Sequence, residues 1–504
     1  MRDERLRHQA YLEWGKIALL PLAFGIAWAV TILAARPILL LISAACGLYV
    51  FFVPVSLRHP LIFVTVFLVF LIALPPLYFS SLGETPIYLS SLLVPIGLAI
   101  LVTRLPDLYL PLDAVTKGLV LFLAGTGLSL PFAWWLSGET IGKQSLLRWL
   151  LLAQTALIFA LVRGGARWPV DRVERWIMPV LLLAAVASAG YGVVDFFWPI
   201  TLPHPAADQF IWLESAVVRR AQGVVYEASS FGNLCGLFLV IASAAFLAGE
   251  ERAVRIARPW LLLCIAILSF AVFVCFSRSV WGNVLTSLGV FVVSSGMVKA
   301  RRAWGFALAF LTPMTLLWIY FPDLWNYFTG NRIGYFGQIL GDPNLVTSGR
   351  LETWATVFSI LRGHPNYLLF GVGYKTLPFT RLFHEEIITD NGFLNLLLET
   401  GILGLGGFLV FSATVFGSFW RLSRRGLGTQ VFWSATLFSL WCGQWVQMLA
   451  ADSYTFWRSM VVLIALMAFA LNRADRTYAG ELSGNLGEQQ SLSARLEFLG
   501  RTNV

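Results

Sequence analysis

The sequence predicts an all-α integral membrane protein that crosses a bilayer many times. Of its 504 residues, 58% are hydrophobic and only 12% are charged, whereas soluble domains carry about 25% charged residues. The apolar residues lie in unbroken runs of roughly 18 or more, the length that spans the hydrocarbon as a helix. We expect helices there because backbone polar groups in lipid must be satisfied within their own segment.

The apolar runs divide into about fourteen predicted spans. They lie near residues 17–34, 38–55, 61–79, 86–102, 112–136, 146–162, 176–197, 229–248, 260–276, 280–297, 303–320, 392–417, 431–449 and 455–471. Residues 1–16 are polar and lead into a run without a small-residue cleavage site, so we expect the first span to be retained. The predicted segments are therefore an N-terminus (1–16), eleven spans (17–320), a large external loop (321–391), three spans (392–471) and a weakly structured polar tail (472–504).

Basic residues in the short connecting loops predict the orientation, because Lys and Arg gather on the cytoplasmic side of a membrane. With a cytoplasmic N-terminus, six basic clusters fall inside: Arg2, Arg5, Arg7 and Lys16; Arg163, Arg167, Arg172 and Arg175; Arg252, Arg255 and Arg258; Lys299, Arg301 and Arg302; Arg421, Arg424 and Arg425; Arg473 and Arg476. We expect both termini in the cytoplasm. The net charge of +9 then reflects topology and not binding to nucleic acid.

The acidic and thiol residues predict no metal or cofactor site. All cysteines lie in or beside apolar runs, without CxxC spacing: Cys46, Cys235, Cys264, Cys275 and Cys442. We expect neither a disulfide nor thiol catalysis. Because no Asp-rich motif occurs, we expect metal-independent chemistry without a cofactor.

Two external segments, 198–228 and 321–391, are much longer than simple connections between spans, and long loops are often functional. The second contains apolar residues at helical spacing from Arg350 onward. They are Leu351, Trp354, Phe358 and Leu361. This stripe predicts an amphipathic helix that lies against the membrane surface or the bundle.

The most informative arginines on the side that this orientation leaves poor in basic residues are Arg219, Arg220, Arg278 and Arg350. Arg278 sits between two apolar runs, where a charge costs about 2.5–3.5 kcal/mol. It either snorkels to the interface at a tight turn or faces a cavity as part of an anion site. Guanidiniums match phosphate oxygens in pairs, and a bilayer offers a diphosphate in a lipid-linked sugar.

Structural alternatives exist for three of these arginines. Arg219 and Arg220 could pair with Glu214 or Glu227, and Arg350 could pair with Glu352 or cap its own helix. The sequence alone is compatible with these pairings and with an anion site.

Five segments resemble, in their order and spacing, the O-antigen ligase and Wzy-type polysaccharide polymerase superfamily. They are RRAQGVVYEASSFGN, CFSRS, TSGRLETW, HPNYLLFGVGYKTL and TDNGFLNLLLETGILGL, within residues 215–420. The resemblance implies a GT-C-like glycosyltransferase of the bacterial inner membrane with a large periplasmic loop. It also implies that Arg220 and Arg278 hold the diphosphate of an undecaprenyl-diphosphate-linked glycan, and that Arg350 supports them.

The sequence departs from the ligases just before the span that follows the large loop. Ligases carry a His-Asn pair there, whereas this chain has Asp390-Asn391, which looks more like some repeat-unit polymerases. Asp390 is a candidate to orient or deprotonate the acceptor hydroxyl; alternatively it caps the helix expected to begin near Gly392. His384 is the reserve base or an exposed loop residue.

Further residues are expected around the site. Arg219, Tyr226, Glu227 and Asn391 are candidates to bind substrate, and Asp195 is a weaker candidate to balance Arg220. Glu385 and Glu386 flank His384. The stretch from His364-Pro365 to Gly371-Val372-Gly373 matches the family pattern, and we expect it to have a structural role.

The implied reaction is a displacement at an anomeric carbon, in which a sugar hydroxyl attacks and the lipid diphosphate leaves. A polymerase of lipid-linked repeat units is the first hypothesis. A ligase that moves a finished glycan onto lipid A core or another acceptor is the second. A polysaccharide transporter or flippase is a third, but transporters place substrate near the midplane, often beside internal repeats, and the charges here gather at the outer ends.

Overall fold

The computed structural model describes residues 52–77, 87–104, 110–164, 170–198, 209–212, 217–320, 322–327, 350–380, 382, 387, 389–426 and 428–475. The chain forms two compact units, 1–63 and 64–504. The helices that carry the candidate site belong to the second unit.

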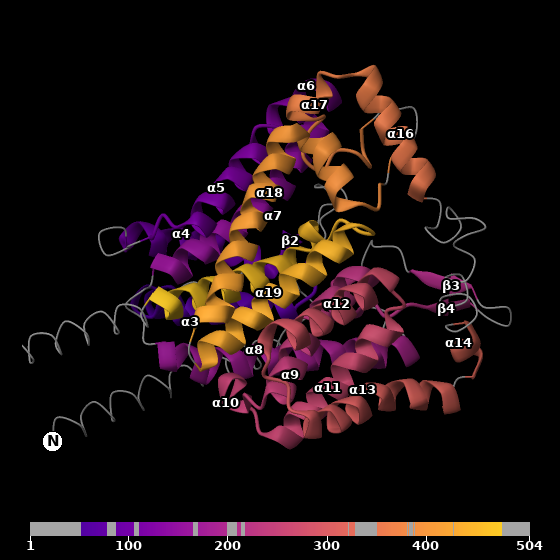
Figure 1. The fold of residues 1–504 in the computed structure, drawn as a ribbon. Coiled ribbons are helices and arrows are strands. Elements are labelled where there is room, and N and C mark those ends of the chain that lie inside the picture. Colours follow the sequence, from indigo (N-terminus) through magenta and orange to yellow (C-terminus); the bar gives the residue numbers. More distant parts are fainter. Residues whose placement is uncertain are drawn as a thin grey trace, which may run out of the picture. The chain divides into compact units, whose positions relative to one another are not determined.

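Helices make up most of the described chain (Figure 1). The α-helices are α3 (Pro60–Ala73), α4 (Val94–Thr103), α5 (Ala114–Gly127), α6 (Leu130–Ser137), α7 (Glu139–Gly164), α8 (Val170–Phe197), α9 (Ala228–Ala248), α10 (Glu251–Val254), α11 (Arg258–Val274), α12 (Arg278–Ser295), α13 (Ala300–Tyr320), α14 (Pro322–Tyr327), α16 (Arg350–Gly363), α17 (Tyr367–Phe370), α18 (Gly392–Arg425) and α19 (Thr429–Met448), followed by a final helix, Trp457–Asp475. Short 3-10 turns are η2 (Leu89–Leu93), η4 (Gly223–Val225) and η7 (Ser453–Thr455). The described strands form two small antiparallel pairs, β1 (Pro76–Leu77) with β2 (Ile87–Tyr88) and β3 (Phe210–Trp212) with β4 (Val217–Arg219).

Seven of the described helices are long and apolar enough to cross a membrane, so the prediction of a helical, polytopic membrane protein is confirmed. These spans are Ala114–Ser137, Glu139–Gly164, Trp176–Phe197, Ala228–Ala248, Ala300–Tyr320, Gly392–Arg425 and Trp457–Asp475. α12 and α19 occupy two further predicted spans but are more polar, because they carry amides such as Asn283 and Gln444. The predicted span 17–34 and most of 38–55 lie outside the described residues. The count of about fourteen stays a prediction.

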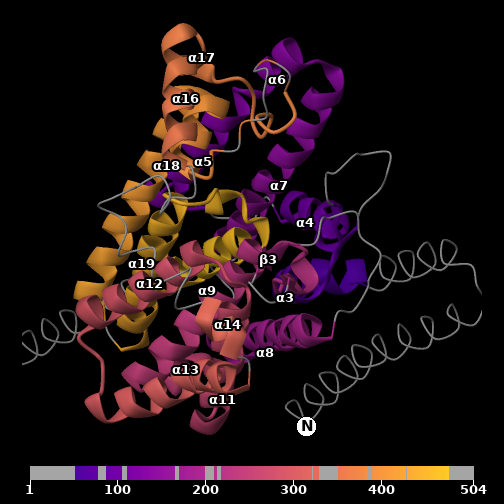
Figure 2. The same ribbon diagram turned by 90° about the vertical axis from the view of Figure 1, so that its right-hand side faces the viewer.

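α9 forms the centre of the helical bundle, and all but two of its residues are buried. It packs against α8, α11, α12, α13 and α19, and Figure 2 shows it among these helices. Its sequence is rich in Ala, Gly and Ser, which let neighbouring backbones approach closely. A polar side chain on α9 is therefore enclosed by protein.

α5 and α18 form a second close contact, through glycines on both helices. A Cβ atom on Gly125 would lie 2.4 Å from the carbonyl oxygen of Leu403, and one on Gly407 would lie 2.7 Å from that of Leu121. The backbones touch because the side chains are absent. This contact holds α18, which begins at the candidate site, against the first half of the chain.

Hydrogen bonds and ion pairs fix which helix ends lie together. The buried Arg163 at the end of α7 pairs with Asp113, the cap of α5, and with Asp475 (2.8 Å) at the end of the final helix. At the other end of the bundle, Ser277 before α12 donates to Ser229 in the first turn of α9 (3.2 Å). The starts of α9 and α12 therefore adjoin.

α18 is kinked at Gly401. The loop that contains Val372 and Gly373 hydrogen-bonds to the turn of α18 just before the kink. The N–H groups of Val372 and Gly373 donate to the carbonyls of Leu398 (3.0 Å) and Glu399 (2.9 Å). α17 packs on the same turn of α18. The Gly-Val-Gly stretch thus has the structural role expected for it.

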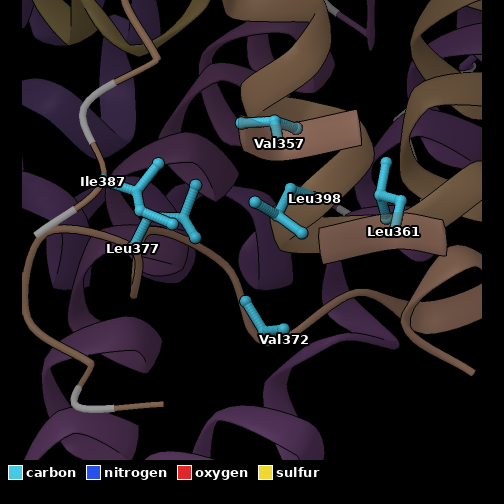
Figure 3. Close-up of a cluster of buried hydrophobic side chains, with 6 residues drawn as sticks. All are labelled: Val357, Leu361, Val372, Leu377, Ile387 and Leu398. Atoms are coloured by element: carbon cyan, nitrogen blue, oxygen red, sulfur yellow. The ribbon is translucent and has the colours of Figure 1, made fainter. Parts of the chain in front are cut away.

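α16 confirms the predicted helix from Arg350, but its packed face differs from the predicted stripe. Val357 and Leu361 are buried against Val372, Leu377, Ile387 and Leu398, as Figure 3 shows. Leu351 and Phe358 are exposed. The packed face therefore shares Leu361 with the predicted stripe and adds Val357, while Leu351 and Phe358 of the stripe lie on an exposed face.

Candidate active site

A hairpin and a 3-10 turn connect α8 to α9 and position the first two arginines. Arg219, the last residue of β4, pairs with Asp195 of α8 (Nη1 to Oδ1, 3.0 Å), and its Nη2 donates to Gln222 (3.3 Å). Asp195 is 2% exposed. Asp195 therefore balances Arg219, and this ion pair fastens the hairpin to the bundle.

Arg220 lies directly beside the segment that contains Arg278. Its Nε donates to the carbonyl of Cys275 (2.8 Å), and the N–H of Ala221 donates to the carbonyl of Val274 (3.0 Å). Arg278 follows Cys275 by three residues and begins α12. Both arginines are half-buried. The structure thus brings Arg220 to the segment that leads into Arg278, which lies 58 positions later in the sequence.

The same place receives the N-termini of two helices. α9 and α12 are tied together at their starts by the hydroxyls of Ser229 and Ser277. A helix N-terminus carries a partial positive charge. The carboxylate of Glu227 occupies the N-terminus of α9, whereas Ser277 before α12 makes no side-chain cap hydrogen bond, so the start of α12 adds to the field of the arginines. This combination favours an anion, and phosphate in particular.

Two strained residues shape the turns that lead into these helices. Tyr226 and Phe276 adopt left-handed backbone conformations, with φ of 60° and 49°. Such values are uncommon outside glycine and cost of order 1–3 kcal/mol each. Each residue stands two positions before its helix. Strained backbone therefore occurs in both turns that lead into α9 and α12.

Glu227 and Tyr226 take structural positions at this site. The carboxylate of Glu227 caps α9 by accepting from the N–H groups of Ser229 (2.8 Å) and Ser230 (2.5 Å). Burial raises the pKa of Tyr226, an effect that the nearby charge of Arg458 opposes. Tyr226 thus stays protonated at neutral pH, and its hydroxyl can donate or accept a hydrogen bond.

Arg458 is a further arginine at this site, and sequence reasoning missed it. It is 3% exposed, its Nη2 donates to the carbonyl of Val224 in η4 (3.2 Å), and its guanidinium lies 5.1 Å from the ring centre of Tyr88. The signal that identified Arg278, a basic residue at the outer end of a predicted span, applies equally to Arg458 at the start of the span 455–471.

Asp390 and Asn391 lie at the start of α18, which begins at Gly392 as predicted. The cap is Asn391, whose Oδ1 accepts from the N–H groups of Phe393 (3.0 Å) and Leu394 (3.1 Å). The alternative in which Asp390 caps this helix is wrong, because Asn391 is the residue adjacent to the first turn. Asp390 instead has φ of 45° and a half-exposed side chain.

Arg350 pairs with Asp390 across 40 positions of sequence, with Nε 3.3 Å from Oδ2. Arg350 is the first residue of α16, and the neighbouring Trp354 donates its indole N–H to the carbonyl of Thr389 (3.0 Å). α16 therefore holds the residues before α18 in place. His384, Glu385 and Glu386 lie outside the described residues.

The C-terminal end of α19 connects the two parts of the site. The side-chain amide of Asn391 donates to the carbonyl of Leu449 (3.4 Å). Two residues earlier, Gln447 accepts from Asn233 of α9 (2.5 Å) and Asn283 of α12 (2.7 Å). The arginine pair and Asp390 thus lie at the same end of the bundle, above a buried layer of amides.

Substitutions at Asp390 and Asn391 distinguish the residue that caps α18 from the residue that precedes the cap. Asn391→Ala removes the cap, and we expect it to lower the free energy of unfolding by about 1 kcal/mol. Asp390→Asn leaves the cap intact, so we expect its free energy of unfolding to stay close to wild type. Thermal unfolding of both variants measures this. Equal destabilisation by the two substitutions would contradict the assignment of the cap to Asn391.

A scan against models of protein families found no match, and a search of curated protein sequences found none either. The chemistry assigned to this site therefore rests on its geometry and on the motifs in the sequence.

Proposed function

We propose that this protein is an inner-membrane glycosyltransferase that polymerises polysaccharide repeat units on the periplasmic side, with an undecaprenyl-diphosphate-linked glycan as donor. The observation that carries the proposal is that Arg220 donates to the carbonyl of Cys275, three residues before Arg278 at the start of α12. Two guanidiniums and the start of α12 suit the two phosphates of the carrier lipid.

The arginines act on the leaving group. As the bond between the anomeric carbon and the diphosphate breaks, negative charge grows on the phosphate oxygen, and fixed guanidiniums stabilise it. The acceptor hydroxyl attacks the same carbon. Asp390, held by Arg350, orients this hydroxyl. The reaction uses no metal ion, so the assay is run with and without a chelator.

The topology proposed with this function has about fourteen spans, a GT-C-like fold and both termini in the cytoplasm. The charge rule supports this sidedness, because it assigns the clusters that contain Arg163 and Arg302 to the inner side. In this topology Arg220 and Arg278 lie on the outer side.

The direct test supplies the purified protein, in lipid nanodiscs, with lipid-linked repeat units as the only substrate. A polymerase extends them into a ladder of longer chains. A strict requirement for lipid A core or another acceptor would replace this proposal with a ligase. Movement of intact lipid-linked glycan across vesicles without any new glycosidic bond would contradict both and support a transporter.

A further inference from the structure

The loop between α19 and the final helix carries a carboxylate, Asp452, that is held from two other parts of the chain. Its Oδ2 accepts from Nζ of Lys375 and from Nδ2 of Asn395 (2.9 Å), which lies one turn into α18. Asp452 and Lys375 are 22% and 18% exposed. Two donors on one oxygen fix the position of the carboxylate without enclosing it.

Lys375 is itself fixed by its surroundings. Its backbone is left-handed, with φ of 55°, and its carbonyl accepts from Nη1 of the buried Arg148 (2.8 Å). Its ammonium lies 6.0 Å from the ring centre of Tyr454. A strained backbone at a lysine that positions a carboxylate is typical of a functional site.

The second carboxylate oxygen of Asp452 is left over by these contacts. Among the residues that the structure describes, no hydrogen-bond donor contacts Oδ1. Within the same described residues, Asp390 is held by Arg350 alone, at 3.3 Å, and is 50% exposed. A general base needs a fixed direction toward its proton, and Asp452 meets this requirement better than Asp390.

The neighbouring acidic groups do not suit the same role. Burial raises the pKa of Tyr374 and of Tyr454 well above its usual range, and the charges of Glu399 and Asp452 raise both further. Both phenols stay protonated. Glu399 is fully buried and accepts from the N–H of Leu377 (3.4 Å), so an external hydroxyl does not reach it.

The position of Asp452 links it to the arginines. Ser453 donates to the carbonyl of Gln444 (3.3 Å), and Gln444 accepts from Asn233 on α9 (3.1 Å). Six positions after Asp452, Arg458 contacts η4, which follows Arg220 by three residues. The loop therefore lies on the same end of the bundle as the starts of α9 and α12.

We propose that Asp452 is the carboxylate that accepts the proton of the attacking acceptor hydroxyl, with Lys375 and Asn395 as its positioning residues; this rests on the transferase function proposed above. The acceptor oxygen forms a bond to the anomeric carbon as its proton moves to Oδ1 of Asp452. The bond between that carbon and the diphosphate breaks, and its electron pair leaves on the diphosphate. Water then takes the proton, and the Asp390–Arg350 pair binds the acceptor sugar.

The experiment measures transfer rate and undecaprenyl diphosphate binding on the full chain in nanodiscs. Asp452→Asn keeps an oxygen that accepts from Lys375 and Asn395 but cannot take a proton. We expect its turnover to fall at least about 100-fold while its affinity for undecaprenyl diphosphate stays within about threefold of wild type. Turnover above a third of the wild-type value would overturn the proposal.

A second variant separates the chemical role from a structural one and covers the case in which Asp452→Asn does not fold. Lys375→Met combined with Asp452→Leu replaces the whole ion pair by apolar groups, which is often neutral for stability. A folded, inactive double variant supports the base, and recovery of wild-type turnover overturns it. Wild-type protein that neither binds undecaprenyl diphosphate nor transfers glycan would instead refute the transferase function itself.

Discussion

Arg278→Ala and Arg220→Ala each lower the rate of glycan transfer by about 100- to 1000-fold, the usual cost of removing one preorganised donor from a developing anion. Each arginine lies beside the start of a helix and is fixed locally. Arg220 donates to Cys275, and Arg278 begins α12. A truncated side chain leaves the backbone contact between Ala221 and Val274 in place. The loss is therefore expected in activity and not in folding.

Arg421→Ala is the matched control for the arginine variants. Arg421 is an exposed arginine near the far end of α18, and its Nε donates to the carbonyl of Gly417 within the same helix. We expect wild-type transfer from this variant, measured on lipid-linked repeats in the same nanodiscs. Equal loss in Arg421→Ala and Arg278→Ala would mean that net positive charge, and not the site, controls the rate.

Gly401→Ala is expected to lower the free energy of unfolding by more than about 3 kcal/mol. Gly401 has φ of 66° and ψ of −168°, a region that is essentially restricted to glycine. A Cβ atom there would also lie 2.3 Å from the carbonyl carbon and oxygen of Leu369. The unfavourable φ and ψ and the close contact with Leu369 both involve backbone atoms, so a change of side-chain rotamer does not relieve either of them.

Gly406→Ala on the same helix provides the comparison for the glycine variant. A Cβ atom on Gly406 meets no atom within 4 Å, and alanine favours a helix over glycine by about 1 kcal/mol. We expect the thermal unfolding midpoint to rise slightly for Gly406→Ala and to fall strongly for Gly401→Ala. Similar midpoints in the two variants would contradict the kink at Gly401.

Sequence reasoning predicted helix positions well wherever a long apolar run determines them. The predicted span 229–248 matches α9 (Ala228–Ala248) closely, and the span 176–197 ends with α8 at Phe197, although that helix begins six residues earlier, at Val170. Hydrophobicity sets these boundaries, because a segment in lipid must satisfy its own backbone. The start of α18 at Gly392 was predicted for a local reason, the pair of cap-forming residues before it.

Details that depend on tertiary partners were not available from the sequence. Asp390 and Asn391 are both good caps, and only their backbone conformations decide that Asn391 serves. α16 presents two apolar faces, and contact with Leu398 selects Val357 and Leu361. The pairing of Lys375 with Asp452 joins residues 77 positions apart, which no local pattern in one sequence indicates.

We propose above all that Arg220 and Arg278 bind a lipid-linked diphosphate. The most direct test of this claim is the equilibrium binding of undecaprenyl diphosphate and undecaprenyl monophosphate to wild-type protein and to the two arginine variants in nanodiscs. We expect wild-type protein to bind the diphosphate at least about tenfold more tightly than the monophosphate, and each variant to lose that preference. An unchanged preference for the diphosphate in Arg220→Ala and Arg278→Ala would contradict the claim.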